Sequence, residues 1–166
     1  MSDDIWILGI TMTKFGKHPD KDVVDLASEA ALGALRDGGV TMKDMGILAA
    51  GNLMNASAGI GQQLQKQIGQ TGIPVYNVAN ACATGATALR TAIMAVKSGE
   101  VDMGLAVGVE KLAGAGLLGA GGTPKSDKKE WAPSGRFGAV TSTDGRIGTA
   151  SMPGVFAQVG MEYGHK

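Results

Sequence analysis

The sequence is poor in cysteine and carries no excess of charge of either sign. Among its 166 residues there is one cysteine, and 15 lysines and arginines balance 15 aspartates and glutamates. A single cysteine excludes a disulfide within the chain and is typical of a reducing compartment. A formal net charge of zero argues against binding to nucleic acid or to an anionic membrane through bulk charge.

Long hydrophobic runs are also missing. Glycine or polar residues interrupt every apolar stretch well before the roughly 18 residues that a membrane-spanning helix requires. No basic group precedes the short apolar run at 5–10, so no signal peptide is predicted. From these absences we expect a cytoplasmic protein that binds neither a membrane nor nucleic acid.

Glycine, by contrast, is abundant. The 27 glycines are about twice the average share, yet they show no G-X-Y period, so a collagen-like fold is excluded. Hydrophobic residues make up 44% of the chain, which argues against disorder. The chain is long enough for one ordinary domain to bury a core without disulfides.

Short apolar runs alternate along the chain with segments of helical period. The runs are nearly continuous, as in strands buried on both faces, and the apolar residues between them recur three and four positions apart. The strands are expected at 5–10, 46–51, 74–78 and 103–109, and the helices at 22–38, 60–70 and 82–98. This β-α-β-α-β-α-β order predicts an α/β protein with a largely buried sheet.

The pattern changes after Glu110. Residues 111–150 hold glycine runs and no sustained period, so loops are predicted there, and 151–166 regain the apolar spacing of a helix. We therefore expect an α/β core over 1–111, and a loop region with the start of a further helix over 112–166. The last residues carry no helix-ending signal, so the chain is expected to be part of something longer.

Cys82 is the residue best suited to chemistry. It follows a predicted strand and begins a predicted helix, where unpaired backbone amides and the helix dipole stabilise a thiolate and an oxyanion. Small neighbours, among them Ala81, Ala83 and Gly85, leave room for a substrate at the sulfur. Free cysteines are also common as buried packing residues, so position alone leaves a catalytic and a structural role open.

Residues 114–119 match the pattern G-x-G-x-x-G, but their context favours a loop. A dinucleotide-binding site requires a helix directly after the glycines and a second strand that ends in an acidic residue. Residues 121–127 continue instead with glycine, proline and polar side chains, which break a helix. We therefore interpret these glycines as loop residues.

Two histidines and a charged segment complete the candidates. His18 and His165 have no metal-ligand spacing with each other or with the one cysteine, so no metal site is predicted. Lone polar histidines are mostly surface residues. Residues 125–130 mix both signs of charge, which indicates a solvated loop, with attraction of a substrate's phosphates as the alternative.

The segment 75–85, with the alanine- and leucine-rich helix after it, resembles the nucleophile region of thiolases. It is most similar to the branch of sterol-carrier-protein-type thiolases and bacterial lipid-transfer acyl-CoA thiolases. Residues 7–16 resemble the family's first strand and turn, 101–110 resemble the strand with the Gly-x-Glu ending, and 152–164 resemble the helix after the substrate loops. The resemblance covers essentially the whole chain and implies the N-terminal half of a thiolase-like fold.

What the resemblance implies is thiolytic cleavage or Claisen condensation of a 3-ketoacyl-CoA. Cys82 would be the catalytic nucleophile and would carry the acyl group as a thioester before passing it to the co-substrate coenzyme A. The Cys82 backbone amide would contribute to an oxyanion hole. Gly85, which permits close packing behind the nucleophile, and Phe156, which lines the acyl pocket, would be the substrate-binding residues. No metal or other cofactor is implied.

The sequence also departs from the family. Thiolases are more than twice this long, and their second half supplies a histidine that activates the nucleophile and often a second cysteine, neither of which is present here. The chain would therefore be a truncated form, a half that pairs with a separate chain, or a non-catalytic remnant.

The resemblance to thiolases leaves several partners and activities open. A homodimer is expected through the strand at 75–79. A hetero-complex with a small protein that carries an OB-fold and a zinc ribbon is an alternative. The competing functions are retro-aldol cleavage of a branched or steroid-side-chain acyl-CoA, and a non-catalytic role as an acyl-CoA or lipid carrier or as a scaffold subunit.

Overall fold

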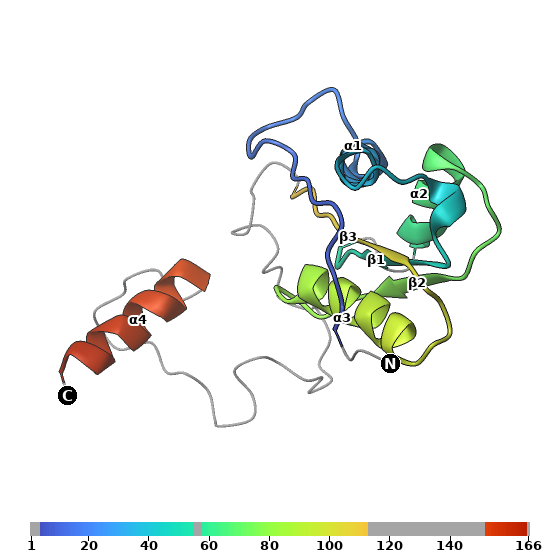
Figure 1. Ribbon diagram of the computed structural model, residues 1–166. Coiled ribbons are helices and arrows are strands. Elements are labelled where there is room, and N and C mark those ends of the chain that lie inside the picture. Colours follow the sequence, from blue (N-terminus) through green and yellow to red (C-terminus); the bar gives the residue numbers. More distant parts are fainter. Residues whose placement is uncertain (1–3, 55–57, 113–151, 166) are drawn as a thin grey trace, which may run out of the picture. The chain divides into compact units, whose positions relative to one another are not determined.

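The computed structural model describes residues 4–54, 58–112 and 152–165 (Figure 1). The chain divides into two compact units, Met1–Lys111 and Leu112–Lys166, and each is described by itself. The first unit holds Cys82 and all the strands of the described residues.

Three parallel strands form the sheet of the first unit, and their order is β2-β1-β3. They are β1 (Ile47–Gly51), β2 (Val75–Val78) and β3 (Gly104–Gly108). β1 is buried at all five positions, as expected of a central strand that is covered on both faces. The sheet therefore has β2 at one edge and β3 at the other.

Helices cover both faces of this sheet (Figure 1). α1 (Val23–Asp37) and α2 (Ile60–Ile68) pack on one face, and α3 (Thr84–Lys97) packs on the other. The alternation of side chains along β1 produces the two layers, since Leu48 packs in the cluster with α1 and α2 whereas Ala49 packs with α3. The predicted α/β class, with a parallel sheet between helices, is confirmed.

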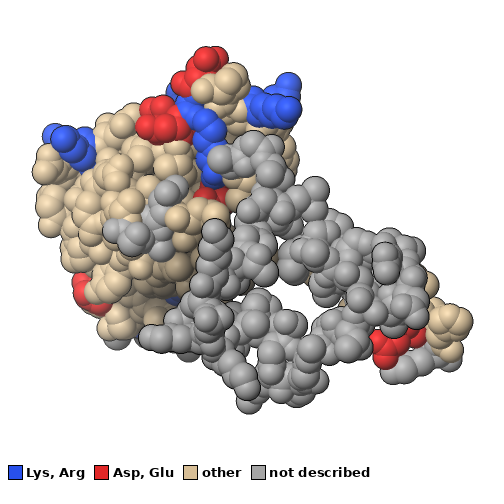
Figure 2. Space-filling model, turned by 180° about the vertical axis from the view of Figure 1, so that it is seen from behind, with Lys and Arg blue, Asp and Glu red and all other residues tan. Residues whose placement is uncertain are grey.

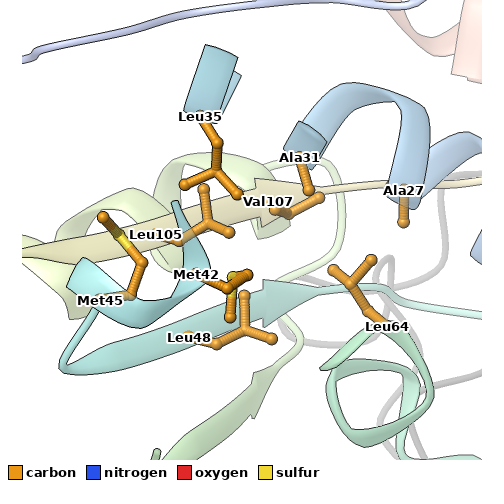
Figure 3. Close-up of a cluster of buried hydrophobic side chains, with 9 residues drawn as sticks. All are labelled: Ala27, Ala31, Leu35, Met42, Met45, Leu48, Leu64, Leu105 and Val107. Carbon is orange, nitrogen blue, oxygen red and sulfur yellow. The ribbon is translucent and has the colours of Figure 1, made fainter. Parts of the chain in front are cut away.

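The larger core cluster lies between the sheet and helices α1 and α2 (Figure 3). Leu48 from β1 and Leu64 from α2 are its largest fully buried side chains, and burying each contributes about 1.5–3 kcal/mol. The cluster consists of Ala27, Ala31, Leu35, Met42, Met45, Leu48, Leu64, Leu105 and Val107. Apolar residues from two of the predicted helices, α1 and α2, and from two of the predicted strands thus meet in one core.

The start of α1 is fixed by a capping box. The Asp25 amide donates to Oδ1 of Asp22 at 2.8 Å, and the Asp22 amide donates back to Oδ2 of Asp25 at 3.0 Å. These bonds satisfy amides that have no partner inside the helix. The bond from the Asp22 amide is the main reason that the pKa of Asp25 is lowered. Asp22 and Gly38 are the caps of the helix, as the sequence predicts.

The predicted strand at 5–10 is wrong for the described structure. These residues belong to no strand, and their large side chains are exposed, with Trp6 80% and Ile10 71% accessible. The segment runs past β3 between α1 and α3 (Figure 1), and the Ile10 amide donates to Oδ2 of Asp37 at 2.9 Å. A strand needs a neighbour in a ladder, and among the described residues β3 pairs only with β1.

Two helix boundaries also differ from prediction. α2 ends at Ile68, because the chain leaves the helix at Gly69, which has a φ of 147°. α3 begins at Thr84 and not at Cys82, because Ala81 has a positive φ of 44°, which a right-handed helix does not allow. Cys82 therefore lies in the turn that leads into the helix.

The second unit contributes one described helix, α4 (Met152–Gly164). The predicted helix at the C-terminal end of the chain is thus confirmed. Residues 113–151, which include the glycine pattern at 114–119 and the charged stretch at 125–130, lie outside the described residues. None of the helices in the described ranges is long and apolar enough to span a bilayer.

Charged side chains of both signs lie close together on the face shown in Figure 2, at one end of the first unit. One contact between opposite charges joins Lys21 to Glu29 on α1. Among the described residues, basic groups form no continuous patch on this face. The mixture of positive and negative side chains on this face is consistent with the formal net charge of zero in the sequence.

Candidate active site

Cys82 lies at the carboxyl edge of the sheet, where α/β proteins place their ligand sites. It stands in the turn between β2 and α3, and its side chain is exposed. No hydrogen bond joins its thiol to another described residue. The thiol is therefore open to a substrate from outside.

The turn around Cys82 is held by Thr84. The Thr84 hydroxyl accepts from the Asn80 amide at 2.8 Å and donates to the Ala81 carbonyl at 2.7 Å. The Ala83 amide donates to the Asn80 carbonyl at 2.9 Å. These bonds maintain the positive φ of Ala81, a conformation that costs a non-glycine residue about 1–3 kcal/mol. The backbone on both sides of Cys82 is thus fixed in a tight turn.

The beginning of α3 leaves backbone amides available. Ala83 is the N-cap residue and provides no side-chain hydrogen bond. The Thr84 and Thr87 amides donate to carbonyls of the turn, but the amides of Gly85 and Ala86 have no acceptor among the described residues. Free amides at a helix N-terminus carry partial positive charge and stabilise anions. The turn therefore combines a free thiol with amides suited to an oxyanion.

Two glycines allow α3 to approach the sheet at this end. A Cβ on Gly51, at the end of β1, would lie 2.8 Å from the Thr84 carbonyl oxygen. A Cβ on Gly108, at the end of β3, would lie 2.7 Å from the Cα of Gly85. Cβ atoms do not come this close to backbone without a shift. The position of the helix that follows Cys82 is therefore set by Gly51 and Gly108, which the sequence did not single out.

A set of polar contacts joins the loops after β1 and β3. Glu110 accepts from the amides of Leu53 and Met54 at 3.0 and 3.1 Å, and from Nδ2 of Asn52 at 3.2 Å. The same Nδ2 donates to the carbonyl of Val109 at 2.9 Å. Asn52 is buried. Glu110 thus fixes the loop after the central strand. The sequence identifies this residue only as part of the Gly-x-Glu ending of 101–110 and does not predict this role.

Of the other predicted residues, Gly85 lies at this site, His18 lies elsewhere in the first unit, and Phe156 and His165 belong to the second unit. Gly85 is in the first turn of α3, and its role as a substrate-binding residue behind the nucleophile stays a prediction. Phe156 lies on α4 in the second unit and is 67% exposed, so its role in an acyl pocket stays a prediction. His18 contacts the Lys14 carbonyl through Nε2 at 2.8 Å, and His165 follows α4.

Among the described residues, no three His, Cys, Asp or Glu side chains gather where they could hold a metal ion.

Comparison with known proteins places the chain in a family. The family described as "Thiolase, N-terminal domain" matches residues 5–122, which include the sheet, Cys82 and Glu110. The chain belongs to the thiolase family. The resemblance noted from residues 75–85 is thereby confirmed.

Curated relatives of this thiolase-family chain include acetyl-CoA acetyltransferases and sterol carrier proteins. An acetyl-CoA acetyltransferase of Methanothermobacter thermautotrophicus is 41% identical over 114 residues, which cover 66% of this chain and 30% of the relative. Sterol carrier protein 2 of Gallus gallus is 31% identical over 168 residues, which cover 100% of this chain and 30% of the relative. The chain thus spans about 30% of the length of these relatives.

Solved structures show the same fold. Xanthomonas campestris OleA H285D matches with a TM-score of 0.51 and 24% identity, over 61% of this chain and 30% of that chain. At this identity the match shows the thiolase-like fold alone. The sheet and helices described above are therefore the N-terminal part of such a fold.

Proposed function

We propose that the chain is the nucleophile-bearing part of an acyl-CoA thiolase, in which Cys82 carries the acyl group. The observation that carries this proposal is the exposed thiol in a fixed turn at the start of α3. The family and the acetyl-CoA acetyltransferase relatives support it. The proposed substrate is a 3-ketoacyl-CoA, and coenzyme A is the co-substrate.

The proposed reaction has two steps. The Cys82 thiolate attacks the keto carbon, the bond between C2 and C3 breaks, and the electron pair leaves on the acetyl-CoA fragment, which takes up a proton. The acyl group remains on Sγ as a thioester. The thiol of coenzyme A then attacks that thioester, loses its proton and restores the free cysteine. The same steps in reverse give condensation.

The residues around Cys82 have distinct parts in this proposal. Amides at the turn and at the start of α3, including that of Cys82 itself, stabilise the oxyanion that forms in each step. Gly85 keeps the space behind the sulfur free, and Phe156 lines the acyl chain. No acid or base is bonded to Cys82 among the described residues, and the proposal assigns the proton transfers to groups outside this chain.

A second candidate function is binding of an acyl-CoA or lipid without catalysis. Relatives named sterol carrier protein 2 favour it. Retro-aldol cleavage of a branched acyl-CoA is a third possibility, but that chemistry has no use for the exposed thiol. A carrier would bind acyl-CoA near Cys82 and form no bond to it, which distinguishes it from a thiolase by experiment.

The proposed assembly also extends beyond the chain. A homodimer through the open edge of β2 would place the turn after that strand, and with it Cys82, next to the partner. An OB-fold and zinc-ribbon protein is the alternative partner. The edge position of β2 and the exposure of Tyr76 support the first arrangement.

The test is covalent trapping on the native protein, in whatever assembly it forms. Acetoacetyl-CoA is added without free coenzyme A, and the mass of the peptide that contains Cys82 is measured. We expect an acetyl adduct on Cys82, its removal when coenzyme A is added, and rapid iodoacetamide labelling that acetyl-CoA suppresses. Cys82→Ser is the control and should yield neither adduct at position 82. Protection from iodoacetamide without an acetyl adduct would refute the thiolase proposal and support the carrier.

A further inference from the structure

Asn52, the residue after β1, ties together the carboxyl ends of the three strands. Its amide donates to the Val78 carbonyl at the end of β2, at 3.2 Å. Its Nδ2 donates to the carbonyl of Val109, which follows β3, at 2.9 Å. The Val109 amide in turn donates to the Gly51 carbonyl at the end of β1, also at 2.9 Å. With only 2% of its surface exposed, Asn52 is a buried link between all three strand ends.

Glu110 sets the orientation of Asn52. Its Oε1 accepts from Nδ2 of Asn52 at 3.2 Å, and its Oε2 accepts from the amides of Leu53 and Met54 at 3.0 and 3.1 Å. Hydrogen bonds from amides to a carboxylate are charge-assisted and stronger than those between neutral groups. A flipped Asn52 side chain would turn its oxygen toward the Glu110 carboxylate and the Val109 carbonyl, which are both acceptors. Glu110 thus holds Asn52 in the orientation that ties the strands.

The turn that carries Cys82 is built on the strand ends that Asn52 joins. Val78, which accepts from the Asn52 amide, ends β2 shortly before the cysteine. On the other side of Cys82, Thr84 packs against the end of β1. A Cβ on Gly51 would lie 2.8 Å from the Thr84 carbonyl oxygen and 2.9 Å from Cγ2 of Thr84. Both sides of the turn therefore rest on backbone that Asn52 holds in place.

We propose that Glu110 is a positioning residue for acyl transfer at Cys82, and that it acts through Asn52. By fixing the strand ends, it holds the turn so that the sulfur and the amides at the start of α3 face the same substrate carbonyl. A displacement of about 1 Å between such groups can slow a reaction about a hundred-fold. The carboxylate is bonded to the loop after β1 and not to Cys82, so its effect reaches the sulfur through the backbone. The inference rests on the proposed thiolase function.

The variant that tests this role is Glu110→Ala, which removes the acceptor for all three donors. Glu110 is exposed, so we expect the variant to fold. The matched control is Asp44→Ala. The Asp44 carboxylate also accepts from a backbone amide, that of Thr41, at 2.7 Å, but it lies before β1, at the amino end of the strand. The control therefore removes a similar bond away from the Cys82 turn.

The first measurement compares two reactions of Cys82 in the native protein. Acetoacetyl-CoA without free coenzyme A acetylates the cysteine through an oxyanion, whereas iodoacetamide alkylates the same sulfur without one. Glu110→Ala should slow acetylation at saturating acetoacetyl-CoA roughly ten- to a hundred-fold. The half-saturating concentration and the alkylation rate should change less than about two-fold. Intact-protein mass spectrometry follows both reactions.

Three results of this comparison would overturn the proposal. They are acetylation of Glu110→Ala at the unsubstituted rate, an equal loss in Asp44→Ala, and an alkylation rate that falls as much as the acetylation rate. A second variant, Asn52→Asp, keeps the shape of the residue but turns an oxygen toward the Glu110 carboxylate. It should show the same slow acetylation as Glu110→Ala, and an unsubstituted rate would contradict the action through Asn52.

The second measurement needs no chemistry at the sulfur. The amides of Ala83 and Thr84 are bonded within the turn, and their hydrogen exchange reports its opening. We expect exchange about ten-fold faster in Glu110→Ala and unchanged in Asp44→Ala. Unchanged exchange in Glu110→Ala would refute the hold of Glu110 on the turn. If the unsubstituted protein takes no acetyl group on Cys82, the thiolase proposal fails, and the exchange rates alone decide whether Glu110 fixes the turn.

Discussion

Gly85 and Gly108 are the residues that bring α3 and β3 into closest contact. The two constraints are not equal, because a Cβ on Gly85 would lie 3.7 Å from the Cα of Gly108, whereas a Cβ on Gly108 would lie 2.7 Å from the Cα of Gly85. The first distance is an ordinary contact, and the second requires backbone to move. Gly108 is thus the position that controls where the helix behind Cys82 sits.

Gly108→Ala should therefore lower the free energy of unfolding by about 1–3 kcal/mol, the usual cost of overpacking. Gly85→Ala is the matched control, and it should leave stability unchanged or raise it by up to about 1 kcal/mol, because alanine is the better helix former. Urea unfolding of both variants measures the difference. Equal destabilisation by the two substitutions would contradict the close approach.

At the scale of single residues, the sequence identified Cys82 because its chemistry and local context are visible in the chain. It assigned no role to Glu110, since the amides of Leu53 and Met54 that Glu110 binds are more than 50 residues away. Nor did it indicate that Gly51 faces Thr84. Contacts of this kind depend on which strands are neighbours, and local pattern does not reveal that.

At the scale of elements, α1 shows how local rules determine a boundary. Asp22 and Asp25 lie three positions apart and bond each other's amides, so both the signal and its effect are local. The predicted start and end of the helix hold for that reason. The strand predicted at 5–10 depended on a non-local contact instead. An apolar run forms a strand only when it pairs with a neighbouring strand, and no such neighbour can be read from the local sequence.

Asp25 also makes the stability of α1 depend on pH. Its pKa is lowered below the usual 3.8, first by the hydrogen bond from the Asp22 amide. A carboxylate with a lowered pKa stabilises the fold above its unfolded pKa, and that contribution is lost as the pH falls through the folded pKa.

The thermal midpoint of Asp25→Asn should therefore lie below that of the unsubstituted chain by a constant amount above about pH 5. The gap should narrow as the pH falls below about 4, because the carboxylate of the unsubstituted chain is then protonated. Circular dichroism melts between pH 3 and pH 7 measure it. A gap that does not change with pH would show that the charge of Asp25 has no part in capping.

At the scale of the whole molecule, the two edges of the sheet are both unpaired in the described residues. The edge at β3 faces a cavity of about 530 Å³, which residues 4–11 line on the other side. The edge at β2 carries Tyr76, which is 45% exposed. Proteins pair or block such edges, and a two-fold axis beside β2 would let two copies pair the same strand with itself.

Tyr76→Asp should convert the proposed dimer into a monomer, because two carboxylates would face each other across the axis. Leu32→Asp is the control, since Leu32 is similarly exposed, at 43%, but lies on α1. Light scattering after size exclusion of the native protein gives the mass. A dimer that persists in Tyr76→Asp, or that is lost equally in Leu32→Asp, would contradict pairing through β2.

The sequence by itself determined the elements that depend on neighbours along the chain: the helical periods, the bounds of α1, the buried strand at 46–51 and the place of Cys82 between a strand and a helix. Only the tertiary structure decided the strand order β2-β1-β3 and the close approach of α3 to Gly51 and Gly108. It also decided the hydrogen bonds of Glu110 to the loop after β1 and the cavity beside β3. The reason is physical. Helical periods and caps are satisfied within a few residues, whereas ladder partners and close backbone approaches join segments that only the fold brings together.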